Sequence, residues 1–250
     1  MDQQELFDFP LFDRAAIAQG GKVAASVPAP GGGIKALNSI KPAFTDAEEK
    51  YFYDETFTDE SLDKDFMVGA SYESCIFSHC QFNKTCFNKT TFQDCTFQNC
   101  QILLTKMENT TLQNVRFLNC KLMGITFSEC NQFGFSLDFR ECLLDTVVFY
   151  GDNLKRVPFY NCQIRNSDFT GCNLSEAGFD GSRFQETIFS DCEMDKADFT
   201  AATGYSIDPY SNKIKGARNI RISREDDRPE LKVVFDKEKL AINGLNASTA

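Results

Sequence analysis

A five-residue period of large apolar side chains runs through the middle of this 250-residue chain. Counting by fives from Phe77 meets an apolar residue at every step: Phe77, Phe82, Phe87, Phe92, Phe97, Ile102, Met107, Leu112, Phe117, Leu122 and Phe127. After a shift of two residues the series resumes: Phe139, Leu144, Phe149, Leu154, Phe159, Ile164, Phe169, Leu174, Phe179, Phe184, Phe189, Met194 and Phe199. A period of five matches neither an α-helix nor a β-strand. It predicts a chain that turns a corner every five residues.

A second position, two residues before each large one, holds small side chains, and we call it the inner slot. Nine of the 11 cysteines occupy it: Cys75, Cys80, Cys95, Cys100, Cys120, Cys142, Cys162, Cys172 and Cys192. Of the other two, Cys130 keeps the first phase into the shift, and Cys86 lies outside the pattern. Buried cysteine behaves as a small apolar residue, so we expect reduced, structural thiols and no metal site. Several of these cysteines recur at intervals of 20 residues, which predicts coils of four segments.

Three segments show the repeat most clearly: Ser167–Gly171, Cys172–Glu176 and Ala197–Ala201. Their order of small, Asn/Asp, Leu/Phe, polar and variable residues resembles the pentapeptide-repeat family. The resemblance implies an all-β fold, a right-handed quadrilateral parallel β-helix with four segments per coil. The 24 segments counted above would then form six coils and a rod about 29 Å long. The resemblance also implies binding rather than catalysis.

The regions before the repeat predict two segments. Residues 1–45 contain the sequence from Pro28 to Gly33 and are expected to form an extended or disordered arm. Residues 46–71 are expected to be an acidic lead-in and N-terminal cap. The five-residue register continues back to Phe57, but the inner slots would then hold Glu55, Glu60 and Asp65. Carboxylates in a dry core are costly, so the solenoid is predicted to start at Tyr72.

The solenoid is predicted to span residues 72–203, with the two-residue shift at 128–138. Residues 204–250 are expected to form a C-terminal cap and tail, with a final turn and a short helix as the family resemblance implies. Asn219 stands where an apolar core residue would be expected. The alternation from Leu231 to Phe235 predicts a strand. Whether this segment caps the rod or joins two rods in a homodimer stays open.

The net charge of −10 argues against direct binding of nucleic acid, because phosphate contacts require Lys and Arg. It is compatible with a surface that competes with nucleic acid for a basic groove. No apolar run reaches the length of a membrane span, and no signal peptide is evident. We therefore expect a cytoplasmic protein with no membrane contact.

Motifs for catalysis, cofactor binding and metal binding are not found. His79 is the single histidine, and neither a phosphate-binding glycine loop nor a nucleophile elbow is present. Asp152 is unusual because it falls in an inner slot. It is either a carboxylate with a perturbed pKa, or it marks a local bulge or a hydrogen bond to backbone amides at a corner.

Candidate partner-binding residues lie in two places. Acidic residues are dense in the last coils, and the outward candidates are Asp180, Glu186, Asp191 and Asp195, although the 20-residue phase spreads the acids over all four sides. Phe133 and Phe135 lie in the shift, where a loop on a rigid scaffold is a common binding position, or both pack into the core.

Two functions follow as hypotheses. The first is a DNA-mimicking protector or modulator of a type II topoisomerase, as the family resemblance implies; relatives with that role end in a dimerising helix that is not evident here. The alternative is a structural or adaptor component of a larger assembly, tethered by residues 1–45. In both cases the partner is a protein, either a topoisomerase or an assembly subunit.

Overall fold

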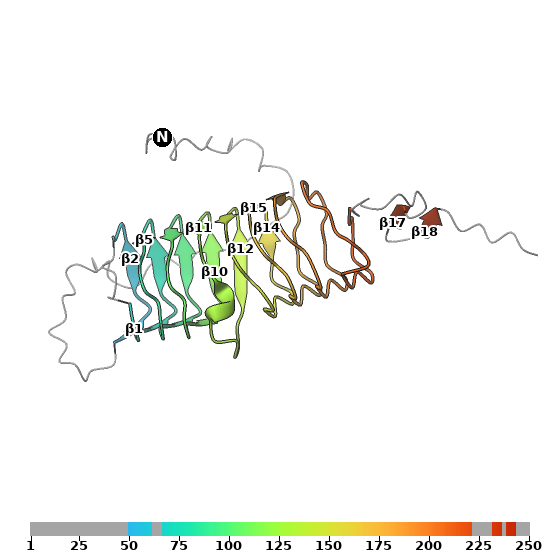
Figure 1. Cartoon of the computed structure of the whole chain (residues 1–250). Helices are drawn as coiled ribbons and strands as arrows, with labels where there is room; N and C mark the ends of the chain where they lie inside the picture. Colours follow the sequence, from blue (N-terminus) through green and yellow to red (C-terminus); the bar gives the residue numbers. More distant parts are fainter. Residues whose placement is uncertain (1–49, 62–66, 222–231, 237–238, 244–250) are drawn as a thin grey trace, which may run out of the picture. The chain divides into compact units, whose positions relative to one another are not determined.

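The computed structural model describes residues 50–61 and 67–221, together with the backbone of two later strands. The predicted arm at 1–45 lies outside the described residues. The described residues 51–61 and 67–221 form a right-handed, four-sided parallel β-helix (Figure 1), which confirms the predicted fold class. Paired residues on successive coils are 20 apart, as in Phe57↔Phe77 and Phe77↔Phe97.

We number the sides in the order in which the chain visits them. Side one contains β1 (Tyr51–Tyr53), β3 (Ser71–Glu73), β6 (Thr91–Gln93) and β9 (Thr111–Gln113). Side two contains β2 (Thr56–Thr58), β4 (Ile76–Ser78), β7 (Thr96–Gln98), β10 (Val115–Leu118), β12 (Leu137–Arg140) and β14 (Phe159–Tyr160). Side three contains β5 (Gln81–Asn83), β8 (Gln101–Leu103), β11 (Lys121–Met123), β13 (Leu143–Asp145), β15 (Gln163–Arg165) and β16 (Arg183–Gln185).

Side four is built differently, since its described residues form isolated bridges in place of strands. Examples are Cys86↔Lys106 and Asp168↔Ile188. Its one regular element is the short 3₁₀ helix η3 (Phe127–Glu129). The inward residues of side four are Met67, Phe87, Met107, Phe127, Phe149, Phe169 and Phe189.

The interior is one continuous stack of the large side chains. On one side, equivalent rings of successive coils lie nearly parallel, with centroids 4.7 Å apart for Phe77–Phe97 and 5.2 Å for Phe97–Phe117. Rings on adjacent sides meet edge to face, as for Phe77 and Phe82 at 5.9 Å. Both geometries are favourable for aromatic rings. The repeated inward position that phenylalanine fits therefore explains 17 of the 25 Phe of this chain.

The inner slot holds small side chains that also form hydrogen bonds between coils. The Cys100 thiol donates to the carbonyl of Phe77 at 3.3 Å, and the Ser182 hydroxyl donates to the carbonyl of Phe159 at 2.6 Å. The backbone N–H of Cys100 in turn donates to the sulfur of Cys120 at 3.4 Å. Cys, Ser and Thr suit this slot because each is small and offers a donor to an otherwise buried carbonyl.

The solenoid starts one coil earlier than the sequence predicted. Tyr51 pairs with Ser71, and Ser61 pairs with Gln81 at the same 20-residue offset. The predicted start at Tyr72 rested on the cost of slot carboxylates. In this first coil Glu55 is only half-buried, because no described coil precedes it, while Glu60 is buried and its carbonyl accepts from the Gln81 amide. Residues 62–66 lie outside the described part of the chain.

The coil also continues past residue 203. Bridges join Glu193 to Lys213 and Asp198 to Arg218. Residues 204–221 thus extend the solenoid and contain no helix, unlike the short helix that was expected. Asn219 occupies a corner at φ +54°, and the buried side chain is that of Ile220. The predicted strand is present as β17 (Lys232–Asp236), which pairs antiparallel with β18 (Lys239–Asn243).

The shift in phase is an insertion at residues 131–136, between η3 and β12. The offset between coils is still 20 at Thr111↔Asn131, becomes 22 at Val115↔Leu137, and returns to 20 at Phe139↔Phe159. In Figure 1 the yellow-green ribbon between η3 and β12 drops below its neighbours. The two extra residues are looped out, so the inward side chains of β12 keep their places.

Candidate partner-binding surfaces

The four candidate acids do not form one patch. Asp180 lies on side two and Asp195 on side one, whereas Glu186 and Asp191 lie at the two corners that border side four. All four side chains are exposed. The acids are therefore distributed over several sides, as the 20-residue phase predicted. Only Glu186 and Asp191 border the same side.

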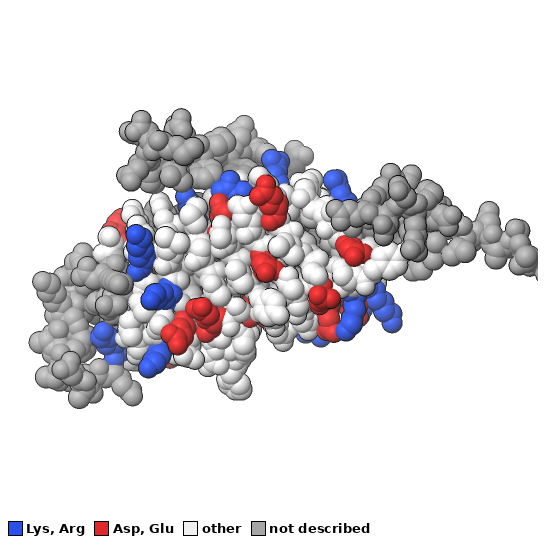
Figure 2. All heavy atoms as spheres, in the orientation of Figure 1, with Lys and Arg blue, Asp and Glu red and all other residues white. Residues whose placement is uncertain are grey.

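On sides one to three, most outward acids of the later coils are neutralised by bases. Glu176 contacts Arg156 at 3.0 Å, and Glu193 contacts Lys213 at 2.6 Å. Further ion pairs are Asp198–Arg218 at 3.3 Å, Asp145–Arg165 at 2.8 Å and Asp138–Arg140 at 3.0 Å. Figure 2 shows acidic and basic side chains interspersed over the face in view. Such mixed surfaces have little net field to attract a charged partner.

Side four differs from the other three in its C-terminal half. Its outward positions there are Val148, Tyr150, Gly151, Asp168, Thr170, Gly171, Ile188, Ser190, Asp191, Asp208, Tyr210 and Ser211, and we call them the side-four surface. None of these described positions is a lysine or arginine. Tyr150, Ile188 and Tyr210 are 62%, 54% and 76% exposed. Sequence reasoning missed this surface because it assigned only the acids to the 20-residue columns and did not count the bases and exposed apolar residues of each column.

The two phenylalanines of the insertion have different surroundings. Phe133 is 81% exposed. Phe135 is half-buried and packs against the core, with its ring centroid 6.4 Å from that of Phe127. The alternative that both rings pack into the core is therefore correct for Phe135 and wrong for Phe133. Phe133 remains available for contact.

Asp152 lies next to the insertion in an inner slot, only 2% exposed. Its Oδ2 has no hydrogen-bond partner among the described residues, so this oxygen does not make the backbone hydrogen bond that one interpretation expected. Burial raises the pKa of Asp152 to about 7, and a hydrogen bond from Gln132 opposes the rise. Asp152 is thus a carboxyl group whose pKa is raised by burial in the core and not by a neighbouring charged group.

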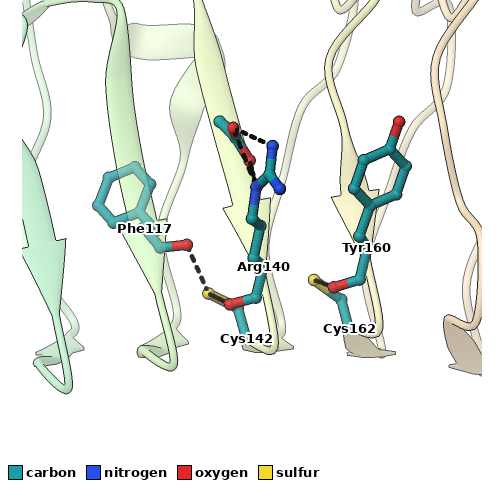
Figure 3. A network of polar contacts seen from close by, with 6 residues as sticks. Phe117, Arg140, Cys142, Tyr160 and Cys162 are labelled. Carbon is teal, nitrogen blue, oxygen red and sulfur yellow. Dashed lines mark hydrogen bonds and ion pairs between the residues drawn. The ribbon is translucent and has the colours of Figure 1, made fainter. Parts of the chain in front are cut away.

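All 11 cysteines are free, and all except the half-buried Cys86 are buried in the rod. Figure 3 shows the Cys142 sulfur between the carbonyls of Phe117 and Arg140, both at 3.3 Å, while the Arg140 guanidinium pairs outward with Asp138. Burial raises the pKa of the Cys192 thiol to about 11, so the reactive thiolate is scarce at neutral pH.

Other chemistry-bearing groups are sparse. No set of three or more His, Cys, Asp or Glu side chains in the described part of the chain could hold a metal ion. His79 is exposed at a corner, with its Nδ1 2.9 Å from the Ser78 hydroxyl. Within the described ranges, no helix is long and apolar enough to cross a membrane.

Comparison with known proteins gives the following matches. A family model described as a pentapeptide repeat region matches residues 70–135, and a model of nine pentapeptide repeats matches residues 147–203. Among solved structures, the plasmid-mediated fluoroquinolone resistance protein QnrB1 is 14% identical, with 70% of this chain and 92% of that chain covered at a TM-score of 0.48. HetL, involved in heterocyst differentiation regulation in the cyanobacterium Nostoc sp. strain PCC 7120, is 15% identical, with 68% and 84% covered at a TM-score of 0.28. A search of curated proteins finds no significant match.

Proposed function

Because this chain is a pentapeptide-repeat protein, we propose that it acts by binding another protein through the outer surface of a non-catalytic solenoid. Pentapeptide-repeat proteins are generally non-enzymatic structural or binding proteins. The observation that carries the proposal is the continuous core: the large side chains of successive coils stack without a gap from Phe57 to Phe199. A partner can therefore reach only the outward residues, which are held in fixed rows.

The specific partner that we propose is a type II topoisomerase, which the rod would protect or modulate by occupying its basic DNA-binding groove. The net charge of −10 supports this proposal, because a basic groove attracts an acidic rod. The ion pairs on sides one to three limit it, since those sides lack a continuous row of free carboxylates. If the mimicry operates, the side-four surface and its bordering acids are the part that would face the groove.

A supercoiling assay tests this role directly. Purified full-length chain is added to DNA gyrase, relaxed plasmid and a fluoroquinolone, and supercoiled product is quantified. We expect the chain to restore supercoiling in a dose-dependent manner, and to do so less well as salt rises, because exposed charges are screened within about 10 Å at 0.1 M salt. A chain in molar excess that changes neither supercoiling nor drug sensitivity would rule the topoisomerase role out.

A second candidate is an adaptor within a larger assembly, tethered by residues 1–45. It is favoured by Phe133, which is 81% exposed on a loop of a rigid scaffold. The test is an affinity capture with the full chain, a chain lacking residues 1–45, and Phe133→Ser. The adaptor role predicts that a specific set of captured proteins is lost with the truncation or with Phe133→Ser. Capture that is unchanged in both variants would contradict it.

A further inference from the structure

The side-four surface is the only long stretch of the described C-terminal coils where acids are not matched by bases. Asp168, Asp191 and Asp208 form no ion pair with a described residue, and neither does Glu186 at the adjoining corner. The carboxylates are also held in place. The Thr170 amide donates to Asp168 Oδ1 at 2.8 Å, and the Tyr210 amide donates to Asp208 Oδ1 at 2.8 Å. No hydrogen bond to the second oxygen of either carboxylate comes from a described residue.

Exposed apolar side chains lie among these acids. Tyr150, Ile188 and Tyr210 are more than half exposed, and the residues between them are small: Gly151, Thr170, Gly171 and Ser190. Tyr150 and Tyr210 are three coils apart, or about 14 Å at the spacing of adjacent strands. That distance corresponds to an extended peptide of four or five residues. The described surface between the two tyrosines thus combines small residues with Ile188 and carries only negative charge.

A cation–π contact between an arginine and an exposed tyrosine already occurs on another side of the rod. On side two the Arg140 guanidinium lies over the Tyr160 ring, 5.5 Å from its centroid. Arginine stacks on aromatic faces and bonds carboxylates with a planar fork, whereas lysine does neither as well. A surface that combines tyrosines with fixed carboxylates therefore favours arginine over lysine.

We propose that the side-four surface binds an arginine-rich segment of a partner protein, with guanidinium groups on Tyr150 and Tyr210 and on the carboxylates between them. This inference rests on the proposed protein-binding function and specifies the chemistry of its partner. It differs from pure mimicry of DNA, which would need carboxylates but no tyrosines.

Charge variants with a matched control test the location. The probe is a fluorescein-labelled nona-arginine peptide, titrated with the full chain by fluorescence polarisation. The test variant combines Glu186→Lys with Asp191→Lys. The control combines Asp180→Lys with Asp195→Lys, which changes net charge equally on sides two and one. Lysine is tolerated at the left-handed corners of Glu186 and Asp191, because Lys84 and Lys89 occupy equivalent corners at φ +55° and +60°.

We expect the test variant to weaken binding about tenfold and the control less than about threefold. Equal weakening by both pairs would mean that only net charge matters and would overturn the assignment. A wild-type chain that does not bind nona-arginine would also overturn it. In that case the broader proposal would stand if the full chain still captures a protein partner.

The aromatic part is tested by a second pair. Tyr150→Ser with Ile188→Ser is compared with Tyr53→Ser and Leu104→Ser, whose exposed fractions of 59% and 53% match the 62% and 54% of the first pair. The first pair should reduce the preference for nona-arginine over nona-lysine by roughly threefold, and the control pair should leave it unchanged. Equal affinity of the wild-type chain for both peptides would contradict the role of the tyrosines. Thermal melts confirm that each variant is folded.

Discussion

The regular coils and the insertion at residues 131–136 differ in how buried polar groups are hydrogen-bonded. In the regular coils, slot groups such as the Cys100 thiol and the Ser182 hydroxyl donate to a carbonyl of the preceding coil, although the buried Thr85 hydroxyl has no partner among the described residues. Beside the insertion, the slot holds Asp152, whose Oδ2 has no partner among the described residues. The sheet of side one also ends at β9, just before the insertion, whereas the sheet of side two continues through β12.

The difference shows how a repeat structure tolerates an error in register. The two extra residues interrupt the hydrogen-bonded ladder of side one only. On side two, the rings of Phe117 and Phe139 still stack, with their centroids 5.2 Å apart. The core therefore continues past the insertion, while the inner slot next to the loop holds the unpaired Oδ2 of Asp152.

The largest effect is expected for an inward ring of a regular coil. Phe169→Ala removes a fully buried side chain and should lower the free energy of unfolding by about 3–5 kcal/mol. Phe135→Ala, at the half-buried ring of the insertion, should cost less than about 2 kcal/mol. Urea denaturation of both variants checks this. Equal losses would mean that the insertion is packed as tightly as the coils.

The next effect concerns the pH dependence that Asp152 introduces. Its pKa of about 7 in the folded chain lies above the ordinary value of 3.8. The folded state therefore holds the proton more tightly, so its contribution to stability is complete below about pH 4 and is lost as pH rises through 7. The loss is at most about 4 kcal/mol by pH 8.

Asp152→Asn should remove this part of the pH dependence, because the amide mimics the protonated carboxyl and does not ionise. The variant should be more stable than the wild type at pH 8 and similar to it at pH 4. Asp180→Asn, at an exposed carboxylate, is the control and should leave the profile unchanged. Denaturation curves for Asp152→Asn that follow the wild-type pH profile would show that Asp152 is not the group responsible.

A smaller effect is expected at the slot thiols. Cys100→Ala loses the hydrogen bond to the Phe77 carbonyl and should cost about 1–2 kcal/mol. Cys100→Ser should cost less, because Ser182 makes the equivalent bond in the same slot. Cys86→Ala, outside the slot and half-buried, should change stability by less than about 0.5 kcal/mol. The idea that the slot requires a donor fails if alanine and serine are equivalent at Cys100.

The smallest effect on stability belongs to the tip of the insertion. Phe133→Ser should lie within about 0.5 kcal/mol of the wild type, because the ring is 81% exposed. Thermal melting measures this. A clear loss of stability would show that the loop contributes to folding, and the comparison between coils and insertion would then need revision.

The fold was predictable from the sequence because the period of five recurs in 24 segments, and no competing pattern explains it. The ends were less predictable. Glu55 and Glu60 argue against a coil only if the inner slot excludes carboxylates, yet the first coil holds both, with Glu55 half-buried and Glu60 buried. Asn219 fills a corner rather than the core, a distinction that depends on local backbone angles.

The candidate site was only partly predictable. The exposed acids were identified individually, but their distribution depends on which column each belongs to. The side-four surface emerges only when residues 20 apart are read together and bases are counted beside acids. The surroundings of Asp152 were not predictable, because Gln132 comes from the insertion, and a looped-out residue has no assigned place in the repeat.

The 20-residue offset between bridged residues, which becomes 22 only across the insertion, also bears on how such a chain can change length over evolutionary time. Duplication or loss of 60 nucleotides adds or removes one whole coil, and the new neighbours meet through interfaces that already exist in the rod. Tyr150 and Tyr210 would then move apart or together in steps of about 4.8 Å. Any other change in length has to be looped out, as at residues 131–136. The length of this molecule therefore changes by whole coils. Copying a coil changes the spacing of a binding site that spans several coils but keeps the packing contacts between neighbouring coils.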